Sequence, residues 1–334
     1  MNLITGATGL LGSHIVQTLR AAGEPVRALV RPTSDTRLLE EWGVEMVTGD
    51  VTEPGSLPAA LRDVKTVYHA AAKVGDWGPW RQFQAISIDG TRNMLDAARD
   101  AGVGRFLHVS SISAYGHPNG KGLVLDETAP LGVHLHRWSY YSRAKAEAER
   151  IAWEYHARGD VPLTVVKPSW LYGPRDRASM PRLVRAIAAG KGKLIGDGGN
   201  RLNLVYAQNE AEGCVLAATS EKAVGEAYNL ASDGEITQRE YFSRIAAELG
   251  VEGPTRKVPY WLAKQGAFWM ECFGHLVRKK SPPLVTRYSV WLIGRQCFFS
   301  SEKARRQLGW RPSVPYEEGI RRAVAWCREH VVDV

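Results

Sequence analysis

Cysteine is scarce in this sequence, and the spacing of the few cysteines argues against two kinds of site. The chain of 334 residues has four cysteines, which lie far apart at Cys214, Cys272, Cys297 and Cys327. They form no Cys-x-x-Cys pair, and the histidines at positions 69, 108, 134 and 136 lack the spacing of metal ligands. We therefore expect buried thiols in a reducing compartment, no disulfide framework and no metal site.

Long hydrophobic runs are also missing. No stretch of about 18 consecutive apolar residues occurs, so we expect no membrane-spanning helix. The first predicted strand begins at Asn2, which leaves no room for a signal peptide before it. The sequence therefore predicts a cytoplasmic protein.

Acidic residues are nearly absent from one stretch, residues 254–296. This stretch has eight Lys or Arg residues and a single acid, Glu271, so it carries almost all of the net charge of +8. The first 250 residues are close to neutral, unlike a nucleic-acid-binding domain with a distributed basic face. We therefore expect a small-molecule partner and no nucleic acid.

A glycine-rich turn follows the first predicted strand. Leu3 to Thr5 is apolar, and Gly6, Gly9 and Gly12 come directly after it, before a helical pattern that begins near Leu10. Such glycines allow a tight turn and a close approach of the backbone to a pyrophosphate at the helix N-terminus. We expect a dinucleotide to bind here; a purely structural turn is the alternative. The predicted contacts are Gly6, Thr8, Gly9, Leu10, Leu11 and Gly12.

Strands and helices alternate regularly up to Pro168. Strands are predicted at 26–30, 44–48, 64–69, 105–110 and 163–167, and helices at 36–42, 81–101 and 140–157. This alternation predicts an α/β fold with a doubly wound parallel sheet. Shorter strands at 193–195, 202–205 and 227–230 suggest a smaller C-terminal α/β lobe. We expect a dinucleotide-binding domain at 1–168, re-entered around 202–232, and a mainly substrate-binding lobe at 169–334.

The end of the second predicted strand bears on the choice of dinucleotide. NAD-preferring sites usually present an acid here, but this chain has Val30 and Arg31, followed by Ser34. A cation suits a 2′-phosphate, so NADP(H) is favoured, while Asp35 keeps NAD(H) as the alternative. After the third strand, Asp50 is expected either to accept from the adenine amino group or to cap the next helix.

A serine, a tyrosine and a lysine occur in an order that suits proton transfer. Ser110 and Ser111 end the fifth predicted strand, and Tyr141 and Lys145 lie one turn apart on one face of a predicted helix. An adjacent ammonium favours phenolate, so Lys145 is expected to lower the pKa of Tyr141 toward the working range. The alternative is an exposed helix pair.

These motifs together resemble the extended short-chain dehydrogenase/reductase family, of the NAD-dependent epimerase/dehydratase type, with its Rossmann sheet. The resemblance covers nearly the whole chain and includes Tyr68 to Ala72, Gly90 to Asn93 and Lys167 to Pro174. It implies that Tyr141 is the general acid/base, Lys145 binds the nicotinamide ribose and Ser111, rather than Ser110, polarises the substrate. It also implies a homodimer through the long sheet-flanking helices. The further cofactor contacts implied are Asp50, Val51, Ala70, Ala71, Ala72, Tyr141, Lys145 and Pro168.

Two places depart from the family pattern. Ser87 stands where relatives usually have Asn, three residues before Gly90, which puts the local hydrogen bonding in doubt. Tyr206 to Asn209 stands where relatives more often carry acids.

Within that family, the stretch from Ala72 to Trp80 and the Trp310 region look most like the 3β-hydroxysteroid dehydrogenase and 2-alkyl-3-oxoalkanoate reductase branch. That branch handles bulky, lipid-like alcohols and ketones. Tryptophans could wall such a pocket, although tryptophans are more often simply core residues. The substrate contacts predicted on this basis are Lys73, Trp77, Trp80, Ser111, Trp138 and Trp170.

The basic stretch contains a predicted amphipathic helix within residues 259–280. Large apolar residues such as Trp261 and Phe273 are followed at once by Arg278, Lys279 and Lys280. This pattern fits an interfacial helix that contacts anionic lipid. A lobe helix packed on the core, with a solvated basic end, is the alternative.

The leading functional hypothesis is an oxidoreductase that interconverts a secondary alcohol and a ketone on a steroid-like or long-chain substrate. A second hypothesis is a nucleotide-sugar epimerase or dehydratase with tightly bound NAD. Its diphosphate would be held by arginines among Arg175, Arg177, Arg182, Arg185 and Arg201. A third is a cofactor-sensing scaffold without catalysis.

Overall fold

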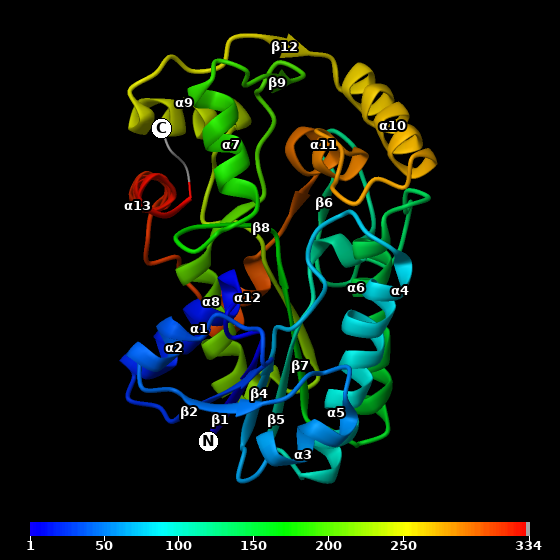
Figure 1. Cartoon of the computed structure of the whole chain (residues 1–334), viewed down its shortest axis with the longest axis vertical. Coiled ribbons are helices and arrows are strands. Elements are labelled where there is room, and N and C mark those ends of the chain that lie inside the picture. Colours follow the sequence, from blue (N-terminus) through cyan, green and yellow to red (C-terminus); the bar gives the residue numbers. More distant parts are fainter. Residues whose placement is uncertain (332–334) are drawn as a thin grey trace.

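A seven-stranded parallel β-sheet forms the centre of the molecule, as the computed structural model of residues 1–331 shows (Figure 1). Its strand order is β11-β7-β5-β4-β1-β2-β3, and every neighbouring pair is parallel. The predicted α/β class and doubly wound sheet are therefore confirmed. The strands of the sheet are β1 (Asn2–Thr5), β2 (Val26–Val30), β3 (Glu45–Thr48), β4 (Thr66–His69), β5 (Arg105–Val109), β7 (Leu163–Pro168) and β11 (Glu226–Leu230).

The strand order reverses at β1. β1 pairs with β2 on one side and with β4 on the other, so the chain crosses over the sheet between β3 and β4. In open parallel sheets such a reversal opens a crevice at the carboxyl ends of the strands. The glycine turn after Thr5 lies at that end of β1.

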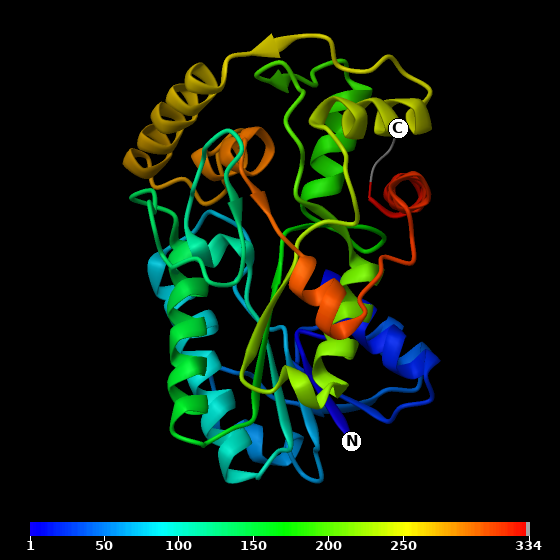
Figure 2. The same ribbon diagram turned by 180° about the vertical axis from the view of Figure 1, so that it is seen from behind.

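Helices cover both faces of the sheet, and each layer buries its own apolar cluster (Figures 1 and 2). On one face lie α1 (Leu10–Ala21), α2 (Arg37–Glu41), α8 (Ala207–Thr219) and α12 (Glu302–Leu308). On the other lie α3 (Leu57–Ala60), α5 (Gly90–Asp100) and α6 (Tyr140–Ala157). The short 3₁₀ turns are η1 (Pro54–Ser56), η3 (Ile112–Tyr115) and η4 (Glu221–Ala223).

The long helix predicted at 81–101 forms, but it is not α-helical throughout. The chain forms α4 (Trp80–Phe83), then a π-helical segment η2 (Gln84–Asp89), and only then α5. Within this segment the Ser87 carbonyl accepts a hydrogen bond from the Thr91 hydroxyl at 2.7 Å. A side chain that takes a backbone carbonyl in this way competes with the regular helical ladder, which periodicity alone does not reveal.

A second, smaller unit covers the carboxyl ends of the strands, and it has its own apolar core. The last three residues assigned to this lobe, 332–334, lie outside the described part of the chain. The chain leaves this unit twice: first to add β11 beside β7 and to pack α8 against α1, and later to place α12 beside β11 and α8. Its elements are β8 (Trp170–Tyr172), α7 (Ser179–Ala188), β9 (Leu194–Ile195), β10 (Leu204–Tyr206), α9 (Gln238–Leu249), β12 (Lys257–Val258), α10 (Tyr260–Leu276), α11 (Arg287–Gly294) and α13 (Tyr316–His330), and β6 (Val124–Leu125) pairs with β13 (Phe298–Phe299) nearby.

Within residues 1–331, no helix combines the length and the apolar character that crossing a membrane requires.

Candidate functional site

The glycine turn leaves no space for side chains between β1 and α1. Gly6 has a φ of +71°, and a Cβ there would lie 2.9 Å from the Ala71 nitrogen. A Cβ on Gly12 would lie 2.1 Å from the Gly6 oxygen, so the turn packs backbone against backbone. α1 begins at Leu10 after the exposed Gly9, and the first N–H groups of a helix have no partner within it. This cradle fits the pyrophosphate of a dinucleotide.

The loop after β4 lies directly beside this turn. The Ala70 nitrogen donates to the Thr5 carbonyl at 3.3 Å, and the Ala71 nitrogen donates to the Thr5 hydroxyl at 3.2 Å. Ser87, the departure from the family's Asn, accepts from the Lys73 nitrogen at 2.9 Å. The loop from Ala70 to Lys73 is therefore held at the mouth of the crevice, and Ser87 supplies a hydrogen bond there.

Arginines gather around the end of β2. The Asp35 carboxylate accepts two hydrogen bonds from Arg37, at 2.9 and 2.8 Å, and one from Arg177 at 3.4 Å. The Arg37 guanidinium holds the pKa of Asp35 well below its usual range. In the same loop the Ser34 hydroxyl accepts from the Arg31 nitrogen at 3.2 Å, and the Arg31 residue is exposed. The acid that could bind a ribose is therefore already paired with two cations.

Asp50 closes a turn at the end of β3. One of its carboxylate oxygens accepts from the Thr52 nitrogen at 2.8 Å and from the Thr52 hydroxyl at 2.9 Å. The residue that precedes the short helix at Pro54 is Glu53, so the alternative role of Asp50 as a helix cap is wrong. Val51 is buried, and its carbonyl accepts from the Asn93 side chain at 2.8 Å.

Ser111, Tyr141 and Lys145 meet at the carboxyl end of β5. The Lys145 ammonium donates to the Val109 carbonyl at 2.7 Å. Ser111 caps the start of η3: its hydroxyl accepts from the Ser113 nitrogen at 3.1 Å and also contacts the Tyr141 phenol. The pair at i and i+4 on α6 thus faces the strand end that carries the serine.

Ser110 is turned away from this group. Its hydroxyl donates to the Glu149 carboxylate at 2.5 Å, in the interior between β5 and α6. Of the two neighbouring serines, only Ser111 therefore contacts Tyr141.

Burial shifts the pKa of both Tyr141 and Lys145, and the Tyr141 pKa shifts in the direction opposite to the one expected. Burial raises the pKa of Tyr141, and the hydrogen bond with Ser111 opposes that rise only in part. The net shift of the Tyr141 pKa is therefore upward, opposite to the expected fall toward the working range, because the cost of burying a phenolate dominates. Burial also lowers the pKa of Lys145, to about 8, and the Glu149 carboxylate opposes that shift. The ammonium therefore titrates near pH 8.

A buried ion pair behind this group has no counterpart in the sequence analysis. Lys167 and Glu149 lie 2.9 Å apart, with side chains that are 2% and 1% exposed. The Lys167 ammonium also donates to the Tyr115 phenol at 3.2 Å. Two features of the sequence could have indicated this pair. Glu149 lies one helical turn after Lys145, and Lys167 is the one charged residue in its strand.

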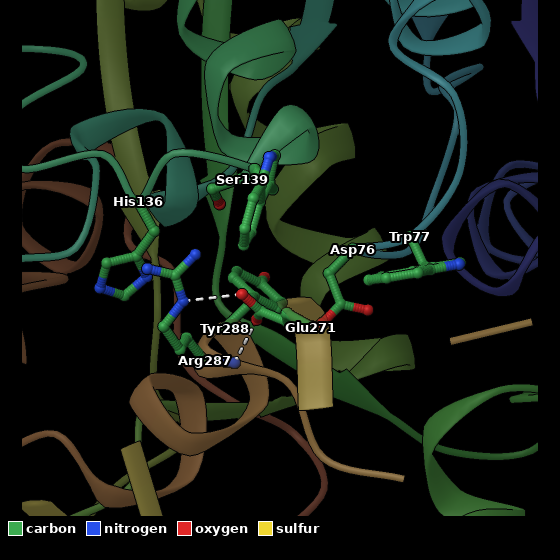
Figure 3. Close-up of a pocket in the computed structure, with 8 residues that line it drawn as sticks. Asp76, Trp77, His136, Ser139, Glu271, Arg287 and Tyr288 are labelled. Carbon is green, nitrogen blue, oxygen red and sulfur yellow. Dashed lines mark hydrogen bonds and ion pairs between the residues drawn. The ribbon is translucent and has the colours of Figure 1, made fainter. Parts of the chain in front are cut away.

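A small pocket lies where α10 and α11 meet the segment before α6 (Figure 3). The Tyr288 ring in its wall lies 6.0 Å from the Tyr141 ring. The pocket encloses about 10 Å³ of space that a water can reach, which is about the minimum needed to hold one water molecule. A bulky substrate therefore requires the wall to shift. The lining residues are Asp76, Trp77, His136, Trp138, Ser139, Glu271, Arg287 and Tyr288.

Two charged residues of this pocket, Glu271 and Arg287, form an ion pair, and the third, Asp76, accepts a hydrogen bond from the Thr286 hydroxyl. Glu271 accepts from the Arg287 side chain at 2.7 Å and from the Arg287 backbone nitrogen at 2.6 Å, as the dashed lines of Figure 3 show. Burial lowers the pKa of His136 to about 4, so this ring is neutral at physiological pH. The remaining wall is largely aromatic.

Only two of the four predicted tryptophans line this pocket, namely Trp77 and Trp138. Trp80 packs instead against α6, with its ring 5.6 Å from Tyr140. Trp170 is only 8% exposed and belongs to the core of the lobe. Lys73 is half-buried and does not line this pocket.

Six of the pocket residues were not predicted from the sequence, and three of these six come from α10 and α11. Glu271, Arg287 and Tyr288 lie about 130 residues or more beyond Tyr141 in the chain. No local motif marks them, because their approach to the site depends on how the lobe docks.

Among residues 1–331, no group of three or more His, Cys, Asp or Glu side chains is arranged to hold a metal ion.

Comparisons with known proteins agree with this geometry. A model of the NAD dependent epimerase/dehydratase family matches residues 2–231. The 2-alkyl-3-oxoalkanoate reductase of Stenotrophomonas maltophilia is 30% identical over 97% of this chain and 98% of its own length. The 3beta-hydroxysteroid-dehydrogenase/decarboxylase isoform 2 of Arabidopsis thaliana is 29% identical over 96% of this chain, which spans 61% of that protein. The crystal structure of gox2253 is 31% identical, with a TM-score of 0.83 over 99% of this chain and 98% of that one.

Proposed function

Because this chain belongs to the NAD-dependent epimerase/dehydratase family and has the extended short-chain dehydrogenase/reductase fold, we propose that it interconverts a secondary alcohol and a ketone on a bulky hydrophobic substrate, with NADP(H) as the preferred cofactor. The substrate class is steroid-like or a long-chain 3-oxo or 3-hydroxy compound. One observation carries the proposal: Ser111, Tyr141 and Lys145 meet beside a pocket with a largely aromatic wall.

The roles of these residues follow from their chemistry. The nicotinamide, when bound, supplies or accepts the hydride at the reacting carbon. Tyr141 donates its phenolic proton to the carbonyl oxygen in reduction, or takes the hydroxyl proton in oxidation. Ser111, which contacts the Tyr141 phenol, holds the same oxygen. Lys145 stabilises the phenolate once the proton has moved. The raised pKa of Tyr141 favours its protonated form, which is the form that reduction requires.

The surroundings of β2 support NADP(H). Asp35 is paired with Arg37 and Arg177, and these pairs compete with ribose hydroxyls for its carboxylate. Arg31 begins the same loop and is exposed, which suits a 2′-phosphate.

The pocket supports an apolar substrate. Trp77, Trp138 and Tyr288 supply its aromatic wall, while Glu271 and Arg287 satisfy each other. The relatives with full-length coverage include a reductase of 2-alkyl-3-oxoalkanoates, which fits the same class of substrate.

The test is a screen of NADPH and NADH oxidation against sterol ketones, long-chain 3-oxo acids and nucleotide sugars. We expect turnover with one of the first two classes, and Tyr141→Phe should reduce kcat at least about 100-fold while dinucleotide affinity changes little. Near-normal turnover by Tyr141→Phe would contradict the mechanism. Turnover of nucleotide sugars alone would contradict the substrate class.

The nucleotide-sugar alternative has weaker support. Its diphosphate would need arginines gathered at the pocket, but the arginines proposed for it hold separate parts of the chain. Arg175 contacts Ser13 and Gln17 on α1, and Arg201 pairs with Glu235. Arg182 and Arg185 donate to backbone carbonyls at 283, 284 and 331. Activity without added cofactor, with NAD that co-purifies, would favour this alternative.

The proposal also includes a homodimer through α5 and α6, as the family resemblance implies. Sedimentation of the purified chain tests it, and a monomer at micromolar concentration would contradict it.

A further inference from the structure

The helix α10 has two unlike faces and stands at the edge of the lobe, beside α11 (Figures 1 and 2). Its inner face is buried through Ala267, Glu271 and Gly274. This inner face covers the pocket, since Glu271 is one of the lining residues. The outer face points away from the rest of the chain.

The outer face of α10 is strongly apolar although it is exposed. Trp269 is 66% exposed, Phe273 is 65% exposed and Leu276 is 81% exposed. Scattered exposed apolar residues are normal, but a contiguous strip marks an interaction surface. Among residues 1–331, eight of the thirteen large exposed apolar side chains lie within 261–284, namely Trp261, Leu262, Trp269, Met270, Phe273, Leu276, Val277 and Leu284.

Positive charge flanks this strip. Lys264 lies on the same helix, and Arg278, Lys279 and Lys280 follow its C-terminal end; all four residues are exposed. The only acid between 259 and 280 is Glu271, which is buried against Arg287. The surface therefore combines aromatic side chains with cations and presents no exposed carboxylate of its own.

We propose that the outer face of α10 docks on the surface of an anionic lipid bilayer. Trp and Phe side chains favour the boundary between headgroups and acyl chains, and basic side chains are attracted to anionic headgroups. Docking of a second copy of this chain on the same face would be less favourable electrostatically. A two-fold contact places the same patch on both sides, and α10 offers no exposed acid to pair with Arg278, Lys279 or Lys280.

Docking would place the cover of the pocket at the lipid surface. The Trp77 ring lies 4.4 Å from His275 on α10, and the Trp77 nitrogen donates to the Lys279 carbonyl at 2.8 Å. Since the pocket encloses only about 10 Å³, a displacement of α10 is the direct way to enlarge it. Entry of an apolar substrate from the bilayer at this point rests on the proposed function, whereas the docking itself does not.

The experiment is vesicle flotation of the full chain without cofactor or substrate. We expect wild type to float with phosphatidylcholine vesicles that contain about 30 mol% phosphatidylserine, to float poorly with phosphatidylcholine alone, and to be released by about 0.5 M NaCl. The triple variant Trp261→Ser, Trp269→Ser, Phe273→Ser and the triple variant Arg278→Glu, Lys279→Glu, Lys280→Glu should each bind about tenfold more weakly or worse. The control is Val124→Ser, which removes an exposed apolar side chain elsewhere and should bind like wild type.

Three results would overturn the proposal. The first is failure of wild type to bind anionic vesicles at low salt, and the second is binding by both triple variants at the wild-type level. The third is a wild-type dimer that the aromatic triple variant dissociates, which would identify the strip as a self-contact. NADPH oxidation with a water-soluble short-chain ketone should be unchanged in both triple variants, so loss of docking can be separated from failure of the proposed function.

Discussion

Replacing Lys145 by methionine should abolish activity and at the same time stabilise the fold. The Lys145 residue is only 5% exposed, and burial lowers the pKa of its ammonium from 10.5 to about 8. Each pKa unit corresponds to about 1.4 kcal/mol, so at pH 7 the buried charge destabilises the folded state by about 3 kcal/mol. Methionine has a similar shape and carries no charge. The variant loses the hydrogen bond to the Val109 carbonyl, which contributes about 1 kcal/mol.

The expected net gain of Lys145→Met at pH 7 is therefore about 2 kcal/mol, or about 3 °C in Tm for a chain of this length. Glu149 keeps its partner Lys167 in this variant, so no buried carboxylate is left unpaired. Urea unfolding and thermal melting measure the gain. Lys121→Met, which removes an exposed lysine, is the control and should leave stability unchanged.

The gain should depend on pH in a defined direction. Between pH 8 and 10.5 the unfolded chain binds more protons at Lys145 than the folded chain does, so wild-type stability rises relative to the variant across this window. The advantage of Lys145→Met should therefore be full below pH 8 and vanish above about pH 10.5. A variant that is less stable than wild type at pH 7, or a gain that does not change with pH, would refute the assignment of a desolvated ammonium.

Three further predictions concern the turn, the buried ion pair and cofactor choice. Gly12→Ala should lower dinucleotide affinity and destabilise the fold by about 1–3 kcal/mol, because the added Cβ has no space. The control is Gly55→Ala, where the added Cβ meets open space; it should change neither the affinity nor the stability. Titration of tryptophan fluorescence with NADPH, together with urea unfolding, measures both effects. Glu149→Gln should destabilise by about 3–5 kcal/mol because it leaves the Lys167 charge buried alone, and the double variant Glu149→Gln, Lys167→Met should recover much of that loss; a double variant no better than the single would contradict the pair's role. Arg31→Glu should lower kcat/KM with NADPH at least about tenfold relative to NADH, and an unchanged ratio would remove Arg31 from the cofactor site.

Much of the fold could be predicted because its signals are local. Buried parallel strands are short apolar runs, and their alternation with helices specifies a doubly wound sheet without reference to distant residues. The order of connection then brings Ser111, at the end of β5, to the start of α6, where Tyr141 and Lys145 lie one turn apart. Ser111 and Tyr141 are in contact in the structure for this reason.

Other features could not be predicted because they depend on packing between distant segments. The pKa direction of Tyr141 follows from how completely its phenol is buried, which no spacing encodes. Trp77 lines the pocket, whereas Trp170 lies in the core of the lobe. This difference depends on which way each side chain points, which the sequence pattern does not indicate.

The sequence by itself determined the sheet, the glycine turn and the order of the serine, tyrosine and lysine, because strand burial, backbone clearance and helical spacing are properties of short segments. Only the tertiary structure decided which of Ser110 and Ser111 faces Tyr141, and that Glu149 and Lys167 form a buried pair. It also decided that α10 closes the pocket with one face and leaves an apolar strip exposed on the other. These outcomes depend on the docking of the lobe and on the burial of charge, which are set by contacts between residues far apart in the chain.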